Sequence, residues 1–411
     1  MRPERSGHPE AVAGNPLTAI KVSRTESVRK LLRFIAIYGP GRSLFKVAGR
    51  LRFKPISMRS NSKRTDIGLI GCGQFGFATI GYFLQHEFGP RIAACHDVDP
   101  AAADTFARAL RVPLVCDSVE TLFTAPGLRT VYIASNHASH ASYASSALRQ
   151  GLDVYVEKPL AVERSQLIEL LRAMRQSGGR IFAGYNRPFS AAIQFLRAHT
   201  TIDTTAGVSL QCFVSGHQIG PDHWYRRPNE GTRVCGNIGH WLDLMVHILA
   251  WRGLPDRLDI SATWADDSEP DDNVSITMRS DRSDLVSVML TSRNEPFEGI
   301  NETINFQHGE TTCKIDDFRQ MVIWQGANLF KRRFWPKDVG HRLAILQPWA
   351  TGPGRDWHEV ELSTLLMLHI TDMVRSRTRS SAFSFSEQWS AIESLLAATD
   401  PGAAPSPSDT L

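Results

Sequence analysis

The spacing of apolar residues changes near residue 187 and divides most of the chain into two regions. Between residues 65 and 186, short apolar runs alternate with segments in which apolar residues recur every three to four positions. This alternation of predicted strands and helices is typical of a doubly wound parallel sheet. The predicted strands span residues 66–71, 91–97, 130–135, 153–158 and 180–186, and the predicted helices span residues 75–86, 101–110, 140–151 and 165–179.

After residue 187, strand-like runs follow one another with few helical segments between them. Consecutive strands without intervening helices predict an antiparallel sheet. The predicted strands span residues 207–217, 256–265, 273–280, 284–292, 302–317 and 320–326, and the predicted helices span residues 191–200, 236–250, 360–376 and 386–399. We therefore expect an α/β domain over residues 65–186 and an α+β domain over residues 187–398, the second with an open antiparallel sheet flanked by helices.

The N-terminal region differs from both domains. Residues 1–24 are rich in Gly, Pro, Ser and Arg, which predicts disorder, and the Pro- and Ser-rich tail at residues 399–411 is expected to be flexible. Residues 25–64 contain two apolar stripes with helical spacing, separated by a glycine- and proline-rich break at residues 39–41. The stripes are Val28, Leu31, Leu32 and Ile35, then Leu44, Val47, Ala48 and Leu51. This segment is predicted to be an arm of two short amphipathic helices.

Positive charge is concentrated in this arm. Residues 1–64 hold 15 Lys and Arg against 3 Asp and Glu, whereas the rest of the chain holds 31 against 39. A basic amphipathic arm is compatible with two interpretations: peripheral contact with an anionic membrane through residues 25–60, or packing on the body or on a partner chain. The sequence contains no run of 18 apolar residues and no apolar signal core. We predict a cytoplasmic protein, with attachment at the inner membrane face as one interpretation, and no nucleic-acid partner.

The six cysteines have no C-x-x-C spacing and form no cluster in the sequence. Such cysteines are typical of reduced, mostly buried thiols rather than of a metal centre or a disulfide framework.

A glycine-rich turn lies between the first predicted strand and the first predicted helix. Gly71-Cys72-Gly73-Gln74-Phe75-Gly76 is a G-x-G-x-x-G motif, and Asp97 ends the next strand 21 residues after the last glycine. The three glycines permit a tight turn, close approach of the backbone to a pyrophosphate, and close packing of helix on strand. A carboxylate at Asp97 accepts hydrogen bonds from a ribose 2′-hydroxyl and repels a 2′-phosphate. Residues 65–186 are therefore predicted to be a Rossmann domain that binds NAD in preference to NADP.

Later motifs carry a family resemblance. Ser135-Asn136-His137-x-x-His140 ends one strand, Glu157-Lys158-Pro159 ends the next, and the sequence GYNRPFS follows a third. In order and spacing these motifs resemble the glucose–fructose oxidoreductase and inositol dehydrogenase family (Gfo/Idh/MocA) over about residues 65–395. The segment GPDHWYRRPNEGTRV, followed by GNIGHWLD, is similar to members that are found with bacterial surface-polysaccharide genes.

The resemblance implies a nicotinamide held over the open sheet, with a sugar or polyol between the two domains. It implies that Lys158 lies near the nicotinamide and stabilises alkoxide-like charge on the reacting oxygen. Pro159, often cis in the family, would aim that lysine into the cleft. The expected cofactor-binding residues are Gly71, Cys72, Gly73, Gln74, Phe75, Gly76, Asp97, Ser135, Asn136, His137, His140, Glu157, Lys158, Pro159 and Asn186.

His240, Asp243 and His247 share one face of a predicted helix because they are three, four and seven positions apart. By resemblance, His240 takes the substrate proton and Asp243 supports it, so we expect both to point into the cleft with Lys158. A metal site formed by the trio is the alternative. We predict no metal, because the family chemistry needs none, and expect His247 to belong to the packing. The chain departs from inositol-dehydrogenase-like members by having Gly236 where they carry an aspartate.

The loop before this helix combines aromatic and basic side chains, which suit a sugar or a nucleotide diphosphate. The expected substrate-binding residues are His223, Trp224, Tyr225, Arg227 and Asn237. We predict an NAD(P)-dependent oxidoreductase that acts on a sugar or nucleotide sugar in surface-polysaccharide biosynthesis, with NAD as the expected cofactor. By resemblance, it forms a homodimer or homotetramer through the open sheet of its substrate and oligomerisation domain. The alternatives are a redox-neutral epimerase or eliminase that uses NAD, and a non-catalytic NAD-binding scaffold docked by its basic arm.

Overall fold

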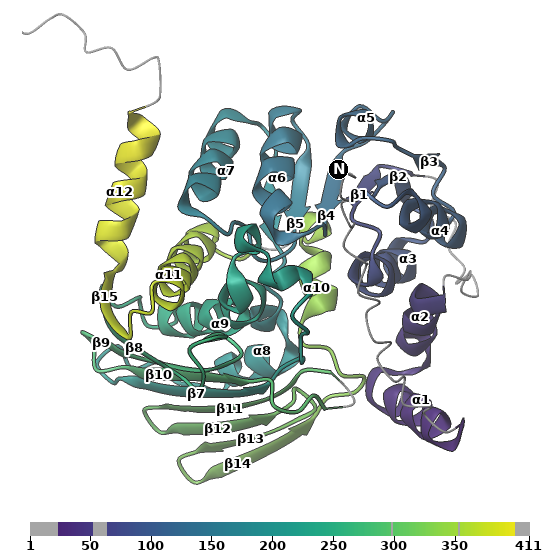
Figure 1. Ribbon diagram of the computed structural model, residues 1–411. Helices are drawn as coiled ribbons and strands as arrows, with labels where there is room; N and C mark the ends of the chain where they lie inside the picture. Colours follow the sequence, from purple (N-terminus) through teal and green to yellow (C-terminus); the bar gives the residue numbers. More distant parts are fainter. Residues whose placement is uncertain (1–23, 52–63, 297–298, 352–353, 399–411) are drawn as a thin grey trace, which may run out of the picture.

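The computed structural model describes residues 24–51, 64–296, 299–351 and 354–398. Within these ranges the chain forms two sheets, the helices that cover them, and a helical N-terminal arm (Figure 1). The predicted disorder of residues 1–24 and the predicted flexible tail at residues 399–411 lie outside the described residues, except for Arg24.

The first domain contains a parallel six-stranded sheet in the order β3-β2-β1-β4-β5-β6. Its strands are β1 (Ile67–Ile70), β2 (Ile92–His96), β3 (Leu114–Val115), β4 (Thr130–Ile133), β5 (Asp153–Val156) and β6 (Ile181–Ala183). Its helices are η1 (Gly76–Gly81), α3 (Tyr82–Phe88), α4 (Pro100–Leu110), α5 (Val119–Phe123), η2 (His137–Ser139), α6 (His140–Arg149) and α7 (Arg164–Gln176). β1 and β4 are buried along their whole length because helices cover both faces of the sheet. The strand order reverses between β1 and β4, which places a ligand crevice at their carboxyl ends.

The second domain contains a nine-stranded sheet in the order β14-β13-β12-β11-β7-β10-β9-β8-β15. Its strands are β7 (Val208–Ser215), β8 (Arg257–Trp264), β9 (Asn273–Ser280), β10 (Leu285–Thr291), β11 (Asn301–His308), β12 (Thr311–Asp316), β13 (Gln320–Gln325), β14 (Asn328–Arg333) and β15 (Ser380–Ser384). The predicted antiparallel sheet is confirmed with one correction: β7 and β10 are parallel. They pair in parallel because the chain between them crosses over through a helix and two further strands.

Helices cover one face of this sheet, as Figure 1 shows for α8, α9 and α11. The helices after residue 186 are η3 (Arg187–Phe189), α8 (Ala191–Ala198), η4 (Trp224–Arg226), η5 (Pro228–Glu230), η6 (Val234–Ile238), α9 (Gly239–Ala250), α10 (His341–Ile345), η7 (Gln347–Trp349), α11 (Trp357–Arg375) and α12 (Phe385–Ala397). Along β7 every second residue is buried, so the strand packs on the helices with one face only. The other face carries exposed Phe213, Met289 and Trp324. Assembly through this face remains a prediction.

The N-terminal arm forms α1 (Arg24–Tyr38) and α2 (Pro40–Leu51), with a break at Gly39, whose φ is +77°. The face of α2 that is buried contains Phe45 and Ala48, whereas Leu51, from the predicted stripe, is exposed. Phe45 packs against Tyr82, with ring centroids 5.1 Å apart. The structure therefore places α2 on the body of the protein, which is one of the two interpretations that the sequence left open. Among the described residues, no helix is long and apolar enough to cross a membrane.

Candidate active site between the two domains

A cleft of about 890 Å³ lies at the carboxyl ends of β1, β2, β4 and β5, and residues of the second domain and of the arm also line it. Small-molecule sites in proteins have volumes of about 300–1,000 Å³. The predicted site residues that line the cleft are Gly71, Gly73, Gln74, Phe75, Gly76, Asp97, Ser135, Asn136, His137, His140, Glu157, Lys158, Asn186, Trp224, Tyr225, Arg227, Asn237 and His240. Those that do not line it are Cys72, Pro159, His223 and Asp243.

The glycine-rich turn has the geometry that a pyrophosphate site requires. Gly71 has a φ of +93°, and a Cβ there would lie 2.4 Å from the Ala134 carbonyl oxygen. At Gly76 a Cβ would lie 2.1 Å from the Gly71 carbonyl oxygen, so only glycine allows η1 to pack this closely. A Cβ on Gly73 would meet nothing within 4 Å, because Gly73 faces open space in the cleft. These residues therefore fit a dinucleotide whose pyrophosphate lies against the backbone of the turn.

Asp97 is held beside this turn. Its carboxylate accepts hydrogen bonds from the backbone amides of Cys72, at 2.6 Å, and Asp99, at 2.9 Å. An ionised carboxylate has about four acceptor positions, so capacity remains for ribose hydroxyls. Cys72 contributes its backbone amide to this arrangement, while its thiol points to the His96 carbonyl oxygen. All six cysteines are free and buried, as predicted for reduced thiols.

The segment after β4 is bound by Glu230 of the second domain. The Glu230 carboxylate accepts hydrogen bonds from the side-chain amide of Asn136, at 2.7 Å, and from the backbone amide of Ala138, at 3.1 Å. Nδ1 of His137 lies 3.1 Å from the Glu230 carbonyl oxygen. Asn136 and His137 thus line the cleft with polar atoms already engaged across the domain boundary. Sequence reasoning missed Glu230 because no motif marks it.

Lys158 follows β5 and lines the cleft. The Lys158–Pro159 peptide is cis. The His140 ring joins two motifs, with Nδ1 2.8 Å from the Pro159 carbonyl oxygen and Nε2 3.1 Å from the Ser135 carbonyl oxygen. Burial lowers the pKa of Lys158 to about 8, against a smaller raising effect of Glu157. A lysine in this range can hold or release a proton near the pH at which enzymes work.

Gly236 holds the Lys158 ammonium directly. Nζ of Lys158 donates a hydrogen bond to the Gly236 carbonyl oxygen at 2.8 Å. A Cβ on Gly236 would lie 2.6 Å from Cε2 of Tyr225 and 2.8 Å from Cε1 of His137. The position at which the resemblance implies an aspartate in inositol-dehydrogenase-like members therefore has no room for a side chain here, and its backbone contacts the lysine instead.

Glu157 is buried and precedes this lysine. Its carboxylate accepts a hydrogen bond from the Tyr155 hydroxyl at 2.8 Å, and burial raises its pKa to about 7. A Cβ on Gly184 would lie 2.8 Å from the Glu157 carboxyl carbon, so a glycine there gives the carboxylate its space.

His240, near the start of α9, faces the cleft, and its buried Nδ1 atom has no hydrogen-bond partner among the described residues. Burial, followed by the charges of Arg187 and Lys158, lowers the pKa of His240 well below its usual range. The imidazole is therefore neutral near pH 7 and carries an acceptor nitrogen.

The expectation that Asp243 points into the cleft is not met. Asp243 is completely buried on the side of α9 that faces α11, where its carboxylate accepts a hydrogen bond from Arg355, at 2.7 Å, and another from the Ser363 hydroxyl, at 2.9 Å. Burial raises the pKa of Asp243, although Arg355 opposes the effect. Asp243 therefore belongs to the packing of α9, and its hydrogen bonds within the described residues do not reach His240.

His247 lies at the edge of the core. Its Nδ1 is 2.9 Å from the Glu359 carboxylate, and its Nε2 accepts a hydrogen bond from the Trp251 indole at 3.3 Å. Within the described ranges, no group of three or more His, Cys, Asp or Glu side chains could hold a metal ion.

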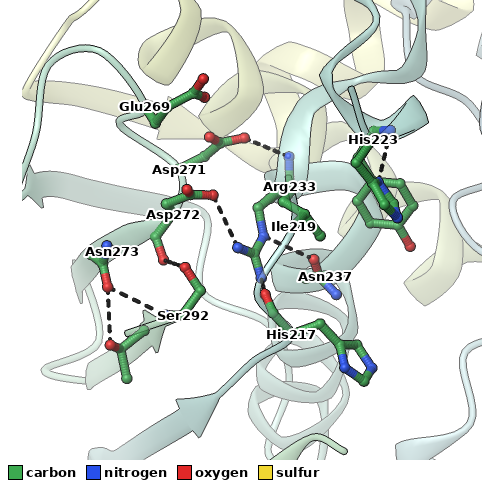
Figure 2. A network of polar contacts seen from close by, with 12 residues as sticks. His217, Ile219, His223, Arg233, Asn237, Glu269, Asp271, Asp272, Asn273 and Ser292 are labelled. Carbon is green, nitrogen blue, oxygen red and sulfur yellow. Dashed lines mark hydrogen bonds and ion pairs between the residues drawn. The ribbon is translucent and has the colours of Figure 1, made fainter. Parts of the chain in front are cut away.

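Buried Arg233 organises the loop that leads to α9, and Figure 2 shows its network. Its guanidinium donates hydrogen bonds to Asp272, at 3.0 Å, to the His217 carbonyl oxygen, at 2.8 Å, and to the Asn237 side chain, at 3.2 Å. The backbone amide of Arg233 donates to Asp271 at 2.6 Å. This network fixes Asn237 at the cleft. Sequence reasoning did not predict the network, because Asp271 and Asp272 come from a loop that is distant in the sequence.

The loop that carries His223, Trp224 and Tyr225 turns inward beside this network. Trp224 and Tyr225 pack against the His137 ring with centroid distances of 4.6 and 4.8 Å. His223 caps η4 by accepting a hydrogen bond from the Tyr225 amide. His223 therefore shapes the loop; it does not line the cleft, and its contact with substrate stays a prediction.

A buried ion pair forms a further part of the lining that the sequence did not reveal. The Arg187 guanidinium donates two hydrogen bonds of 2.8 Å to the Glu302 carboxylate. The Trp241 indole donates to the same carboxylate at 2.6 Å, and Arg187 lies over the Trp241 ring at 4.2 Å. The Glu302 carboxylate thereby accepts three hydrogen bonds and compensates the Arg187 charge inside the cleft wall. Further lining residues that sequence reasoning did not assign are Tyr38, Arg42, Lys46, Lys337 and His341.

The fold and the cleft define a two-domain oxidoreductase whose first domain is an NAD-binding Rossmann fold. Residues 65–185 match the family model described as "Oxidoreductase family, NAD-binding Rossmann fold". Over residues 65–185 the chain is therefore similar to the Gfo/Idh/MocA family of oxidoreductases, in agreement with the resemblance seen in its motifs.

Similar proteins include inositol dehydrogenases. A myo-inositol dehydrogenase from Streptomyces leeuwenhoekii is 26% identical over 60% of this chain and 77% of that protein. An inositol 2-dehydrogenase from Ralstonia nicotianae is 28% identical over 45% of this chain, and the match spans about half of the relative's length, 53%.

Solved structures share the fold. The WlbA dehydrogenase from Bordetella pertussis, in complex with NADH and UDP-GlcNAcA, superimposes with a TM-score of 0.63 at 19% identity. The superposition covers 78% of this chain and 99% of that one. Levoglucosan dehydrogenase in complex with NADH and levoglucosan gives a TM-score of 0.64 at 14% identity, over 78% of this chain and 99% of that one.

Proposed function

We propose that this protein transfers hydride between NAD and a hydroxyl or keto carbon of a sugar or nucleotide sugar. The observation that carries the proposal is the meeting of Lys158, His240 and the glycine-rich turn in one cleft. The inositol dehydrogenases among the relatives, and the WlbA complex with NADH and a nucleotide sugar among the structures, support this substrate class.

The roles of the residues follow from their contacts. NAD, when bound, supplies the hydride acceptor. The Lys158 ammonium, oriented by the Gly236 carbonyl oxygen, donates a hydrogen bond to the substrate oxygen and stabilises the negative charge that develops there. His240 is neutral and accepts the hydroxyl proton. Trp224, Tyr225 and the domain junction exclude water and orient the sugar.

Turnover with a panel of substrates tests the proposal. Purified protein is mixed with NAD and with myo-inositol, free hexoses or UDP-sugars, and NADH is followed at 340 nm. We expect Lys158→Met and His240→Asn each to lower kcat by about 10²–10⁴-fold, as is typical for loss of a positioned proton donor or acceptor. Lys331→Met, which removes an exposed lysine on β14, is the control and should retain wild-type turnover. A Lys158→Met enzyme as fast as wild type would refute the assignment.

The same experiment separates the alternatives. Conversion of a sugar to an epimer or a dehydrated product without net NADH indicates a redox-neutral reaction. Tight NADH binding with no turnover on any sugar indicates a scaffold. Preference for UDP-sugars over free polyols supports a role in surface-polysaccharide biosynthesis.

A further inference from the structure

Helix α2 is docked against the glycine-rich turn. The Gln74 side-chain amide donates a hydrogen bond to the Lys46 carbonyl oxygen at 3.2 Å. Gly49 lies so close to η1 that a Cβ there would be 3.1 Å from the Phe77 ring. The position of α2 is therefore set by direct contact with the segment that is expected to hold a pyrophosphate.

The arm is also bound to the second domain. The Trp335 indole donates a hydrogen bond to the Ala36 carbonyl oxygen at 2.8 Å, and the Lys337 amide donates to the Ile37 carbonyl oxygen at 2.8 Å. The Arg42 guanidinium donates to the Lys337 carbonyl oxygen at 3.4 Å. The arm thus bridges the two domains beside the cleft, in a position that fits a fixed wall of the site.

The face of the arm that lines the cleft is cationic. Tyr38, Arg42 and Lys46 are four residues apart along α1 and α2, and all three line the cleft. In the described part of the chain, no carboxylate lies within ion-pair distance of Arg42 or Lys46; the Lys46 ammonium lies 4.2 Å from the Phe34 ring centroid. Lys337, which also lines the cleft, is paired with Asp317 at 2.6 Å.

The electrostatics of Lys46 show the same imbalance. Burial, followed by the charges of Arg50 and Arg42, lowers the pKa of Lys46 to about 8, against a smaller raising effect of Glu295. Two cations held together beside a cleft, with no carboxylate of the described residues within ion-pair distance, attract an anion of matching charge and size.

We propose that Arg42 and Lys46 form the cationic wall of a diphosphate site whose other wall is the glycine-rich turn. The inference rests on the proposed function, which brings two diphosphates to the cleft: that of the dinucleotide and that of a nucleotide-sugar substrate. A guanidinium matches phosphate oxygens with paired N–H donors, and an ammonium adds a second charge-assisted contact.

Binding measurements with matched charge removals on one helix test this inference. Lys46→Met and the double variant Arg42→Met/Lys46→Met remove the lining cations, while Arg50→Met removes an exposed cation of α2 that does not line the cleft. NADH is titrated by its fluorescence, and UDP is titrated by calorimetry into protein saturated with NADH. We expect about tenfold weaker binding for Lys46→Met and about a hundredfold for the double variant, with Arg50→Met unchanged. Thermal unfolding confirms that each variant folds.

The two ligands distinguish the sources of the diphosphate. A loss confined to NADH assigns the wall to the dinucleotide, and a loss confined to UDP assigns it to a nucleotide substrate. If the wild-type protein binds both ligands, and Lys46→Met and the double variant bind them equally tightly, the inference is overturned while the proposed function stands. A wild-type protein that binds neither ligand would contradict both.

Discussion

The partly buried Lys158, which is held in the wall of the cleft, should make the stability of the protein depend on pH. Burial lowers the pKa of Lys158 from 10.5 to about 8, which corresponds to about 3 kcal/mol against the charged form in the folded state. Because the folded state binds the proton more weakly than the unfolded state, this destabilisation is fully present below pH 8 and is relieved as the pH rises toward 10.5. Between pH 7.5 and 10 the relief amounts to about 2 kcal/mol.

Lys158→Met removes this titration, so the comparison of wild type with variant isolates it. We expect the Tm of wild type minus that of Lys158→Met to rise by about 3 °C between pH 7.5 and 10 in a chain of this length. Circular dichroism melts of both proteins in the same buffers measure the difference, since titration of the groups that the Lys158 charge does not influence is common to both. Lys331→Met serves as the control for loss of an exposed lysine. A difference that stays constant or falls with pH would refute the description of Lys158 as a partly buried, desolvated ammonium.

Three further substitutions test other parts of the site. Gly236→Asp restores the carboxylate of inositol-dehydrogenase-like members but is expected to cost about 1–3 kcal/mol through overlap with Tyr225 and His137; melts of Gly236→Asp and Gly236→Ala check this, and a stable, faster Gly236→Asp enzyme would contradict it. Asp243→Asn removes the closer carboxylate partner of Arg355 and leaves Glu359 at 3.5 Å, so we expect a loss of about 1–3 kcal/mol in urea unfolding without a change in the pH profile of kcat; a shifted profile would return Asp243 to the proton relay. Asp97→Ala is expected to reduce the preference for NAD over NADP in kcat/KM by about tenfold, because it removes the ribose acceptor; an unchanged ratio would count against that role.

Local spacing was sufficient to predict the first domain and its glycine-rich turn. Gly71, Gly73, Gly76 and Asp97 lie within one strand–helix–strand unit, so their geometry is determined by the turn itself. The structure places each glycine in the environment that its position predicts. The edge strands β3, β14 and β15 were not predicted, since β14, for example, is exposed along most of its length and has no apolar alternation.

Contacts between segments that are distant in the sequence determine the orientation of Asp243 and the packing of the arm, which the sequence pattern did not predict. Helical spacing placed His240 and Asp243 on one face, but α9 is covered on two sides, and Arg355, 112 residues further along the chain, binds Asp243 away from the cleft. In the same way, whether the arm packs on the body of the protein depends on which surface Phe45 contacts. The periodicity of the sequence does not identify that surface. The buried face of α2 also differs from the predicted stripe at Leu44, Val47, Ala48 and Leu51, because α2 packs through Phe45, Ala48 and Gly49.

The replacement of an aspartate by Gly236 changes the chemistry of the lysine that it contacts. A carboxylate beside Lys158 would stabilise the ammonium and raise its pKa, as the Glu157 charge already does in part. A carbonyl oxygen orients the ammonium equally well but carries no net charge, so burial dominates and the pKa of Lys158 falls to about 8. A carbonyl oxygen also cannot take up a proton, so we infer that the substrate proton leaves through His240. We therefore propose that the glycine directs the proton to the histidine while it keeps the lysine titratable near pH 8.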